Sequence, residues 1–186
     1  MSAYRVHTIE SAPEKSRQAL QGLQQAFGLI PNLAATMAES PVLVNGFVGA
    51  FLGFHGGSFT GAQRQVLLLT NAVVNSCAWA VAFHSTLALK EGVEPGDVQA
   101  IRERRLPKDR GLAALSALAR ALIEKRGHLD EREVIAFTGA GFGHDQVLEV
   151  IVGLAVSTMA NYAGNITKPP VEEPFRAQAW SPSQPQ

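Results

Sequence analysis

The sequence predicts an all-α protein, and three observations support this prediction. Apolar residues recur three and four positions apart along most of the chain, glycine and proline stand at the ends of these stretches, and no stretch alternates apolar and polar residues as a strand does. The 186 residues are enough for one domain, with 46% apolar and 17% charged residues. We expect an N-terminal arm over residues 1–12, a single helical domain over 13–167 and an extended tail over 168–186.

Local signals set the helix boundaries in the first half of the chain. Leu23 and Phe27 lie on one apolar face, and Gly28 ends that helix. Pro41 suits the first turn of a later helix, and Thr60 is a good N-cap for the helix that follows it. The predicted helices of this half cover residues 13–27, 33–39, 41–55 and 62–74.

Similar signals divide the second half. Asn75 and Ser76 can end one helix and cap the next. Gly127 ends an amphipathic helix, and the spacing of Asp130 and Glu133 matches a capping box. The predicted helices of this half cover residues 77–90, 97–104, 110–125, 130–137 and 145–165.

The composition excludes several classes of function. Sixteen Lys and Arg residues balance sixteen Asp and Glu residues, so we expect no nucleic-acid partner that binds a strongly basic surface. The N-terminal residues lack an apolar signal core, which predicts a cytoplasmic protein. A single cysteine, Cys77, rules out an intramolecular disulfide and a multi-cysteine zinc site, and we expect neither a metal nor a cofactor.

The charges are unevenly distributed along the chain. Between residues 40 and 89 the one formally charged side chain is Arg64. Thr70, Asn71 and Asn75 interrupt the most apolar part of this segment, which argues against a membrane span. We therefore expect the uncharged helices to form the interface of a homo-oligomer.

Cys77 and His84 are the first candidates for a functional site. They lie seven residues apart, nearly two helical turns, and so share a helix face with Ala80 between them. At the start of a helix, the helix dipole is expected to lower the pKa of the Cys77 thiol. The two side chains remain several Å apart, so a water or substrate would have to bridge them. The alternative is a small buried cysteine and a core histidine with satisfied hydrogen bonds.

At these residues the sequence resembles the AhpD-like, or carboxymuconolactone decarboxylase-like, superfamily in its peroxidase-related branch. That superfamily carries C-x-x-C-x-x-x-H at a helix start, and residues 77–84 here read C-A-W-A-V-A-F-H. Further similar stretches are F-G-L-I-P-N at residues 27–32, S-P at 40–41, N-Y at 161–162 and the ending from Pro174 to Trp180. The resemblance covers most of the chain and implies an AhpD-like helical bundle.

The resemblance also assigns roles to individual residues. Cys77 takes the position of the first, resolving cysteine, and Ala80 that of the second, which attacks the peroxide. His84 matches the proton-relaying histidine, and Gln65 stands in place of the glutamate. The motif is therefore incomplete. The leading hypothesis is a thiol-dependent hydroperoxide reductase in which Cys77 becomes a sulfenic acid, His84 assists through water, and an external thiol restores Cys77.

Two alternatives stay open. A decarboxylase-like enzyme would use His84 and Arg64 to bind or protonate a small acid or lactone, unless Arg64 forms a structural ion pair with Glu39, Glu91 or another subunit. A non-catalytic oligomer would bind a small apolar ligand near Trp79, Phe83, His84 and His55, although two aromatic side chains at this spacing are more often part of a core.

Overall fold

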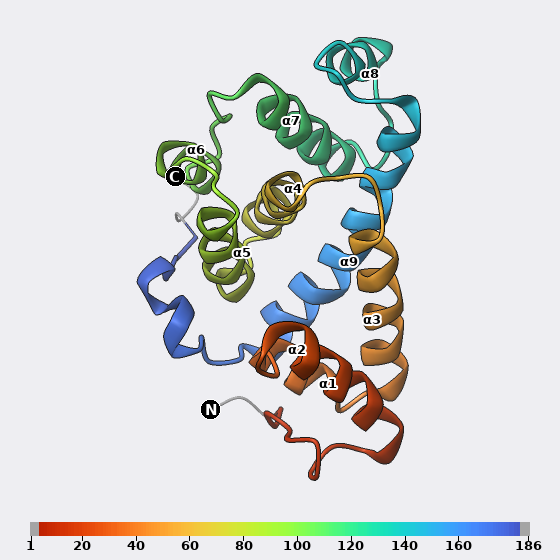
Figure 1. Cartoon of the computed structure of the whole chain (residues 1–186), viewed down its shortest axis with the longest axis vertical. Helices are drawn as coiled ribbons and strands as arrows, with labels where there is room; N and C mark the ends of the chain where they lie inside the picture. The colour runs from red at the N-terminus through yellow and green to blue at the C-terminus, as the bar shows by residue number, and fades with distance from the viewer. Residues whose placement is uncertain (1–3, 183–186) are drawn as a thin grey trace.

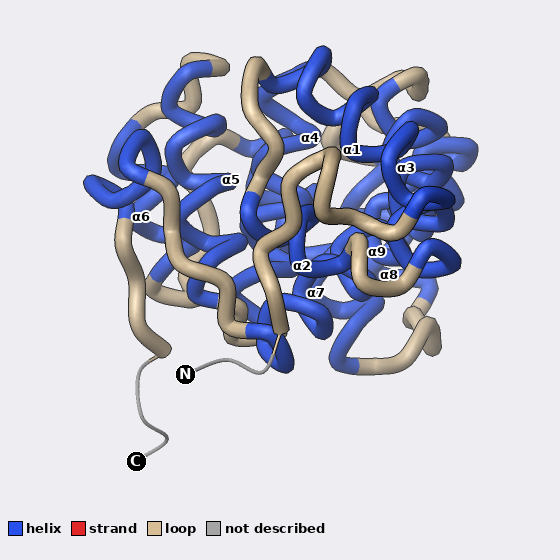
Figure 2. Tube along the Cα trace, turned by 90° about the horizontal axis from the view of Figure 1, so that it is seen from below, coloured by secondary structure: helices blue, strands red, loops and turns tan. Residues whose placement is uncertain are grey.

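The computed structural model describes residues 4–182. Within this range the chain forms α-helices and one 3₁₀ helix and contains no strand (Figure 2), so the all-α prediction is confirmed. The elements are α1 (Glu14–Phe27), α2 (Asn32–Met37), α3 (Pro41–His55), α4 (Gly61–Val74), α5 (Ala78–Lys90), α6 (Pro95–Arg102), α7 (Arg110–Glu124), α8 (Glu131–Thr138), α9 (His144–Thr167) and the 3₁₀ helix η1 (Glu173–Gln178).

Helices α4 and α5 pack against each other in the middle of the molecule (Figure 1). The long helix α9 crosses the fold beside α3, while α1 with α2 and α7 with α8 lie at opposite ends (Figure 1). The core has two apolar clusters. One joins side chains of α1 to α6, α9 and η1, and the other joins side chains of α3, α4, α7, α8 and α9. Helices α3, α4 and α9 contribute to both clusters and so connect the two parts of the core.

The helix starts follow the capping chemistry that the sequence indicates. Thr60 and Gln63 form a reciprocal capping box at α4, and the Ser40 side chain accepts from the Leu43 N–H at α3. The start of α5 differs from the prediction. Its N-cap is Cys77, because Ser76 takes a left-handed conformation with φ 53° in the turn after α4.

The C-terminal segment is not extended throughout, which corrects the expectation for residues 168–186. Residues Glu173–Gln178 form η1, which packs on α5. Phe175 is buried, with its ring 4.9 Å from that of Phe83 and 6.5 Å from that of Trp79. Burial of Phe175, together with the partly buried Val171 and Trp180, stabilises the segment in this folded-back position. Residues 183–186 lie outside the described range.

Burial inside the chain accounts for most of the uncharged segment. Helices α4 and α5 are largely buried against each other and their neighbours, whereas α3 buries only Val44 and Phe54. Helix α9 is long and apolar enough to cross a membrane, but core helices of other proteins meet the same criterion. Here α9 contacts α2, α3, α4, α5, α7 and α8, as a core helix does.

Candidate functional site

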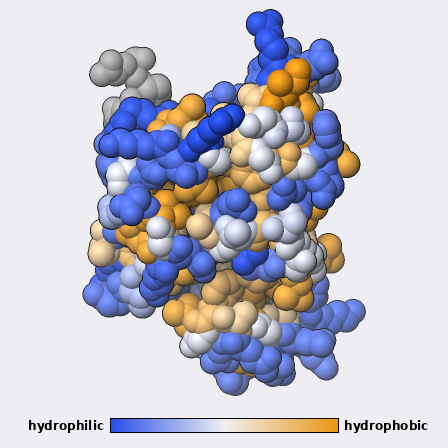
Figure 3. Space-filling view, turned by 45° about the horizontal axis from the view of Figure 1, so that its top comes forward, coloured by the Kyte–Doolittle hydropathy of each residue, from blue (hydrophilic) through white to orange (hydrophobic). Residues whose placement is uncertain are grey.

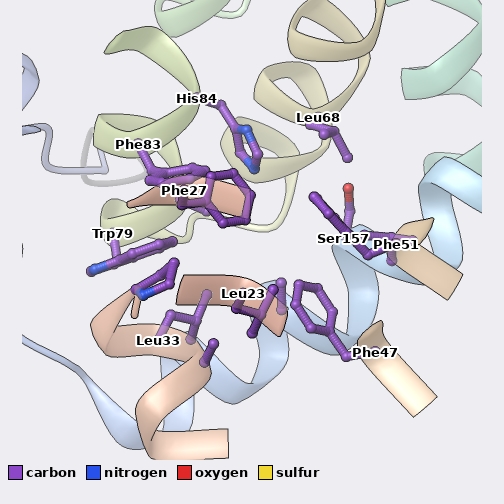
Figure 4. A pocket seen from close by; sticks show the side chains of 15 residues that line it. Leu23, Phe27, Leu33, Phe47, Phe51, Leu68, Trp79, Phe83, His84 and Ser157 are labelled. Atoms are coloured by element: carbon purple, nitrogen blue, oxygen red, sulfur yellow. The ribbon is translucent and has the colours of Figure 1, made fainter. Parts of the chain in front are cut away.

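A cavity of about 50 Å³ lies between α1, α2, α3, α4, α5 and α9. Five aromatic rings form much of its wall (Figure 4): Phe27, Phe47, Phe51, Trp79 and Phe83. The cavity is partly open to solvent, and the half-buried rings of Phe27 and Phe51 lie 5.5 Å apart. Such a mainly apolar concave site with few polar groups is typical of small-molecule binding.

Helix α5 contributes one wall of the cavity. Trp79 and Phe83, one turn apart, stack with their ring centroids 4.9 Å apart. The indole Nε1–H of Trp79 donates to Glu172 at 2.8 Å, and this bond occupies the polar edge of the ring. Ala80, at the position of the family's second cysteine, is fully buried and lies on the cavity wall.

His84 brings a polar group to this wall. Its Nδ1 lies 2.9 Å from Oε1 of Gln65, which accepts a hydrogen bond from the ring. Burial, and to a smaller degree the nearby His55, lowers the pKa of His84 to about 3. The imidazole is therefore neutral at physiological pH, with its proton on Nδ1 and a lone pair on Nε2. Two of the predicted site residues, His84 and Gln65, are thus brought together.

His55 and Arg64 lie close to the cavity but do not line it. The ring of His55 stacks on Phe51 with centroids 3.8 Å apart, and its Nδ1 donates to the Phe51 carbonyl. Burial, and also the charge of Arg64, lowers the pKa of His55. Arg64 donates to the Phe59 carbonyl and leaves its buried Nε without a partner. In the described part of the chain Arg64 forms no ion pair, and Glu39 pairs with His7 instead.

Cys77 lies apart from His84. Its side chain contributes to a separate surface cleft of about 290 Å³, together with Trp79, Gly164 and Lys168. Only 1% of Cys77 is exposed. Desolvation raises the pKa of its thiol, and hydrogen bonds from the Ala80 and Trp79 backbone only partly oppose this. The expected lowering of the thiol pKa is therefore wrong, because burial outweighs the effect of the helix N-terminus.

A polar pair on α4 and α9 was not identified from the sequence. Ser157 lines the cavity, and its Oγ accepts a hydrogen bond of 3.1 Å from Nδ2 of Asn71. Both residues are buried. The available signal was the presence of Asn71 and Ser157 inside otherwise apolar helices, but only the fold brings them together. Among residues 4–182, no three His, Cys, Asp or Glu side chains are grouped as metal ligands would be.

Comparisons with known proteins agree with this architecture. The model of the carboxymuconolactone decarboxylase family matches residues 43–124, from α3 to the end of α7. No similar protein is found among the curated sequences. Among solved structures, the AhpD core of an uncharacterized peroxidase-related protein from Ralstonia eutropha JMP134 aligns with a TM-score of 0.82 and 18% identity over 98% of both chains.

Two further solved structures share the fold. A cysteine-to-alanine variant of the debrominase Bmp8, in complex with 2,3,4-tribromopyrrole, aligns with a TM-score of 0.78 and 18% identity over 96% of both chains. An uncharacterized peroxidase-related protein from Silicibacter sp. TM1040 aligns with a TM-score of 0.77 and 14% identity over 95% of both chains.

These findings define the class of the protein. It has an AhpD-like helical fold, and residues 43–124 match the model of the carboxymuconolactone decarboxylase family. The AhpD-like helical fold expected from the sequence is therefore confirmed. The roles of Cys77, His84 and the other motif residues remain predictions.

Proposed function

We propose that the protein binds a small, mainly apolar molecule in the aromatic cavity and that the Cys77 thiol takes no part in this binding. One observation carries the proposal: Ala80 and His84 line this cavity, whereas Cys77 belongs to the other cleft. Where the family motif has its attacking cysteine, this chain has a methyl group and the space around it. The neutral His84–Gln65 pair favours an uncharged ligand.

The cavity volume restricts how such a ligand enters. About 50 Å³ is less than the roughly 150 Å³ of an engineered cavity that holds benzene. A five- or six-membered ring therefore requires side chains at the open side, such as Phe27 and Phe51, to move. The complex of the debrominase Bmp8 with 2,3,4-tribromopyrrole supports the idea that this fold can hold a ring of that size.

The experiment that tests the proposal compares the two cavities. Pyrrole, phenol and toluene are titrated into the ¹⁵N-labelled protein, and the indole resonance of Trp79 and the ring resonances of His84 are followed. Ala80→Val narrows the aromatic cavity and should weaken binding, whereas Ala78→Val narrows only the Cys77 cleft and should not. Binding to neither the wild type nor the variants contradicts the proposal.

A one-cysteine peroxidase is the second candidate. The backbone N–H groups of Trp79 and Ala80 at the start of α5 bond to the Cys77 thiol, which favours a thiolate once the side chain becomes accessible. The thiolate would take one oxygen from a hydroperoxide, giving a sulfenic acid and an alcohol, and two external thiols would then reduce the sulfenic acid. Cys77→Ser should abolish this activity and leave ligand binding in the aromatic cavity unchanged.

Self-association is proposed through α3 and α9, which contact each other. Helix α9 exposes Leu148, Val152, Tyr162 and Ile166, and α3 carries no charged residue and exposes Val42 and Leu52. On the face that Figure 3 shows, by contrast, the hydrophobic residues form separate areas between hydrophilic ones.

The oligomeric state tests this proposal. Light scattering after size exclusion should give an oligomer for the wild type and a smaller species for Leu148→Lys combined with Val152→Lys. Leu106→Lys, at an exposed loop, is the control; a monomeric wild type contradicts the proposal.

A further inference from the structure

Two side chains can form hydrogen bonds with a molecule in the aromatic cavity. His84 enters it from α5 and Ser157 from α9, and the other lining side chains are apolar apart from Trp79 (Figure 4). The Trp79 N–H is already bound to Glu172. Recognition of a polar group inside this cavity therefore depends on His84 and Ser157.

His84 faces the cavity as an acceptor. Gln65 is 6% exposed and holds its Oε1 at 2.9 Å from Nδ1 of His84, which places the ring proton on Nδ1. Nε2 then keeps its lone pair, and it forms no hydrogen bond within residues 4–182. A ligand O–H or N–H group can satisfy it.

Ser157 faces the cavity as a donor. Asn71 is fully buried and donates from Nδ2 to the Ser157 Oγ at 3.1 Å. If the Asn71 side-chain amide were turned over, its NH₂ group would be buried without a partner. That costs more free energy than the unpaired Oδ1 of the observed orientation. Since the Asn71 bond occupies a lone pair of Oγ, the hydroxyl hydrogen is left to donate, and no acceptor for it occurs in the described part of the chain.

We infer that the cavity selects a neutral ligand with a hydroxyl group on an apolar frame, such as a phenol or a small cyclic alcohol. This inference rests on the proposed function and assigns its ligand class. A hydroxyl group donates one hydrogen bond and accepts others, so it matches the His84 acceptor and the Ser157 donor together. A carboxylate does not match, because it would face the lone pair of His84 Nε2 and would lose its hydration in an apolar cavity.

The test compares phenol with toluene, which has a similar shape but no hydroxyl group. We expect wild-type protein to bind phenol at least about tenfold more tightly, because toluene leaves both polar groups unpaired. Ser157→Ala should reduce this preference several-fold. Ser116→Ala is the matched control, since Ser116 is equally buried but bonds to Thr70 away from the cavity, and it should leave the preference unchanged.

The outcomes separate the inference from the proposed function. If neither compound binds the wild type, the proposed function fails. If both bind equally, or if Ser157→Ala keeps the full preference, the ligand class is wrong while the binding site stands. The ¹⁵N shifts of the His84 ring give a measurement that needs no variant. A proton on Nδ1 with an unprotonated Nε2 is expected, and the opposite tautomer overturns the acceptor role.

Discussion

The thiol of Cys77 packs directly on the backbone of Gly164. A methyl group placed on Gly164 would lie 2.8 Å from the Cys77 Sγ and 3.3 Å from Cδ1 of Leu33. The start of α5 can approach α9 this closely only because residue 164 has no side chain. Cys77 thus contributes to helix packing, because its sulfur atom fills the space beside Gly164 of α9.

Gly164→Ala is expected to destabilise the fold. The added methyl group has to displace Sγ of Cys77 or shift α9, and such overpacking costs about 1–3 kcal/mol in the free energy of unfolding. Urea denaturation measures this. Gly22→Ala is the control. A Cβ at residue 22 meets nothing within 4 Å, and alanine is more favourable than glycine inside a helix, so this variant should lose no stability. The double variant Cys77→Ala with Gly164→Ala should recover part of the loss; no loss in the single variant would disprove the close contact.

Cys77 is expected to react slowly in the folded protein. Burial raises the pKa of its thiol and leaves 1% of the residue exposed, so little thiolate forms and reagents reach it only when the structure opens. Intact mass spectrometry after pulses of iodoacetamide or organic hydroperoxide should give rates well below those of the denatured chain. A rate that equals or exceeds that of a free thiol would instead support the peroxidase candidate.

The helical fold could be predicted from the sequence because its signals are local. The Thr60 cap and the glycine and proline boundaries act within a few residues, and they located the helices to within a few positions. The two sides of α5 could not be distinguished in this way. A spacing of seven residues puts Cys77 and His84 on the same helix face. In the structure, however, they line two different cavities, and Trp79 lies between these cavities and contributes to both.

The partners of the candidate site come from distant parts of the chain. Gln65 was identified by position in a family motif, and the structure adds its hydrogen bond to His84. Ser157 had no such motif, because its importance depends on the packing of α9 against α4. The fold of the C-terminal segment was missed for the same reason. Phe175 has no local pattern that predicts its burial on Phe83, 92 positions earlier in the chain.

Glu172 is expected to hold the C-terminal segment on α5. Its carboxylate accepts from the Trp79 indole at 2.8 Å and from the Asn32 backbone N–H at 2.6 Å, at the start of α2. Glu172→Ala removes both charge-assisted bonds, so the segment should detach more often and trypsin should cut after the exposed Arg176 several-fold faster. Gln178→Ala is the control, since only the main chain of Gln178 is bonded. Equal cleavage rates would disprove this role.

His84 is expected to make the folded state sensitive to mild acid. Its pKa is about 3 in the folded protein, against an ordinary value near 6.5, because burial, and to a smaller degree His55, disfavours the charged ring. The unfolded chain therefore binds a proton that the folded chain does not, and stability falls as the pH falls from about 6.5 toward about 3. At pH 5 this single group lowers the free energy of unfolding by roughly 2 kcal/mol.

His84→Gln should remove that dependence. The difference in unfolding free energy between pH 7 and pH 5, measured by urea denaturation, is expected to be about 2 kcal/mol smaller in the variant than in the wild type. Any constant loss from the altered contact with Gln65 cancels, because each protein is compared with itself. His55 contributes in the same direction, but it is present in both proteins. His128→Gln, at an exposed position, should keep the wild-type difference. If His84→Gln keeps it too, His84 is charged in the folded protein, and it cannot be the neutral acceptor of the cavity.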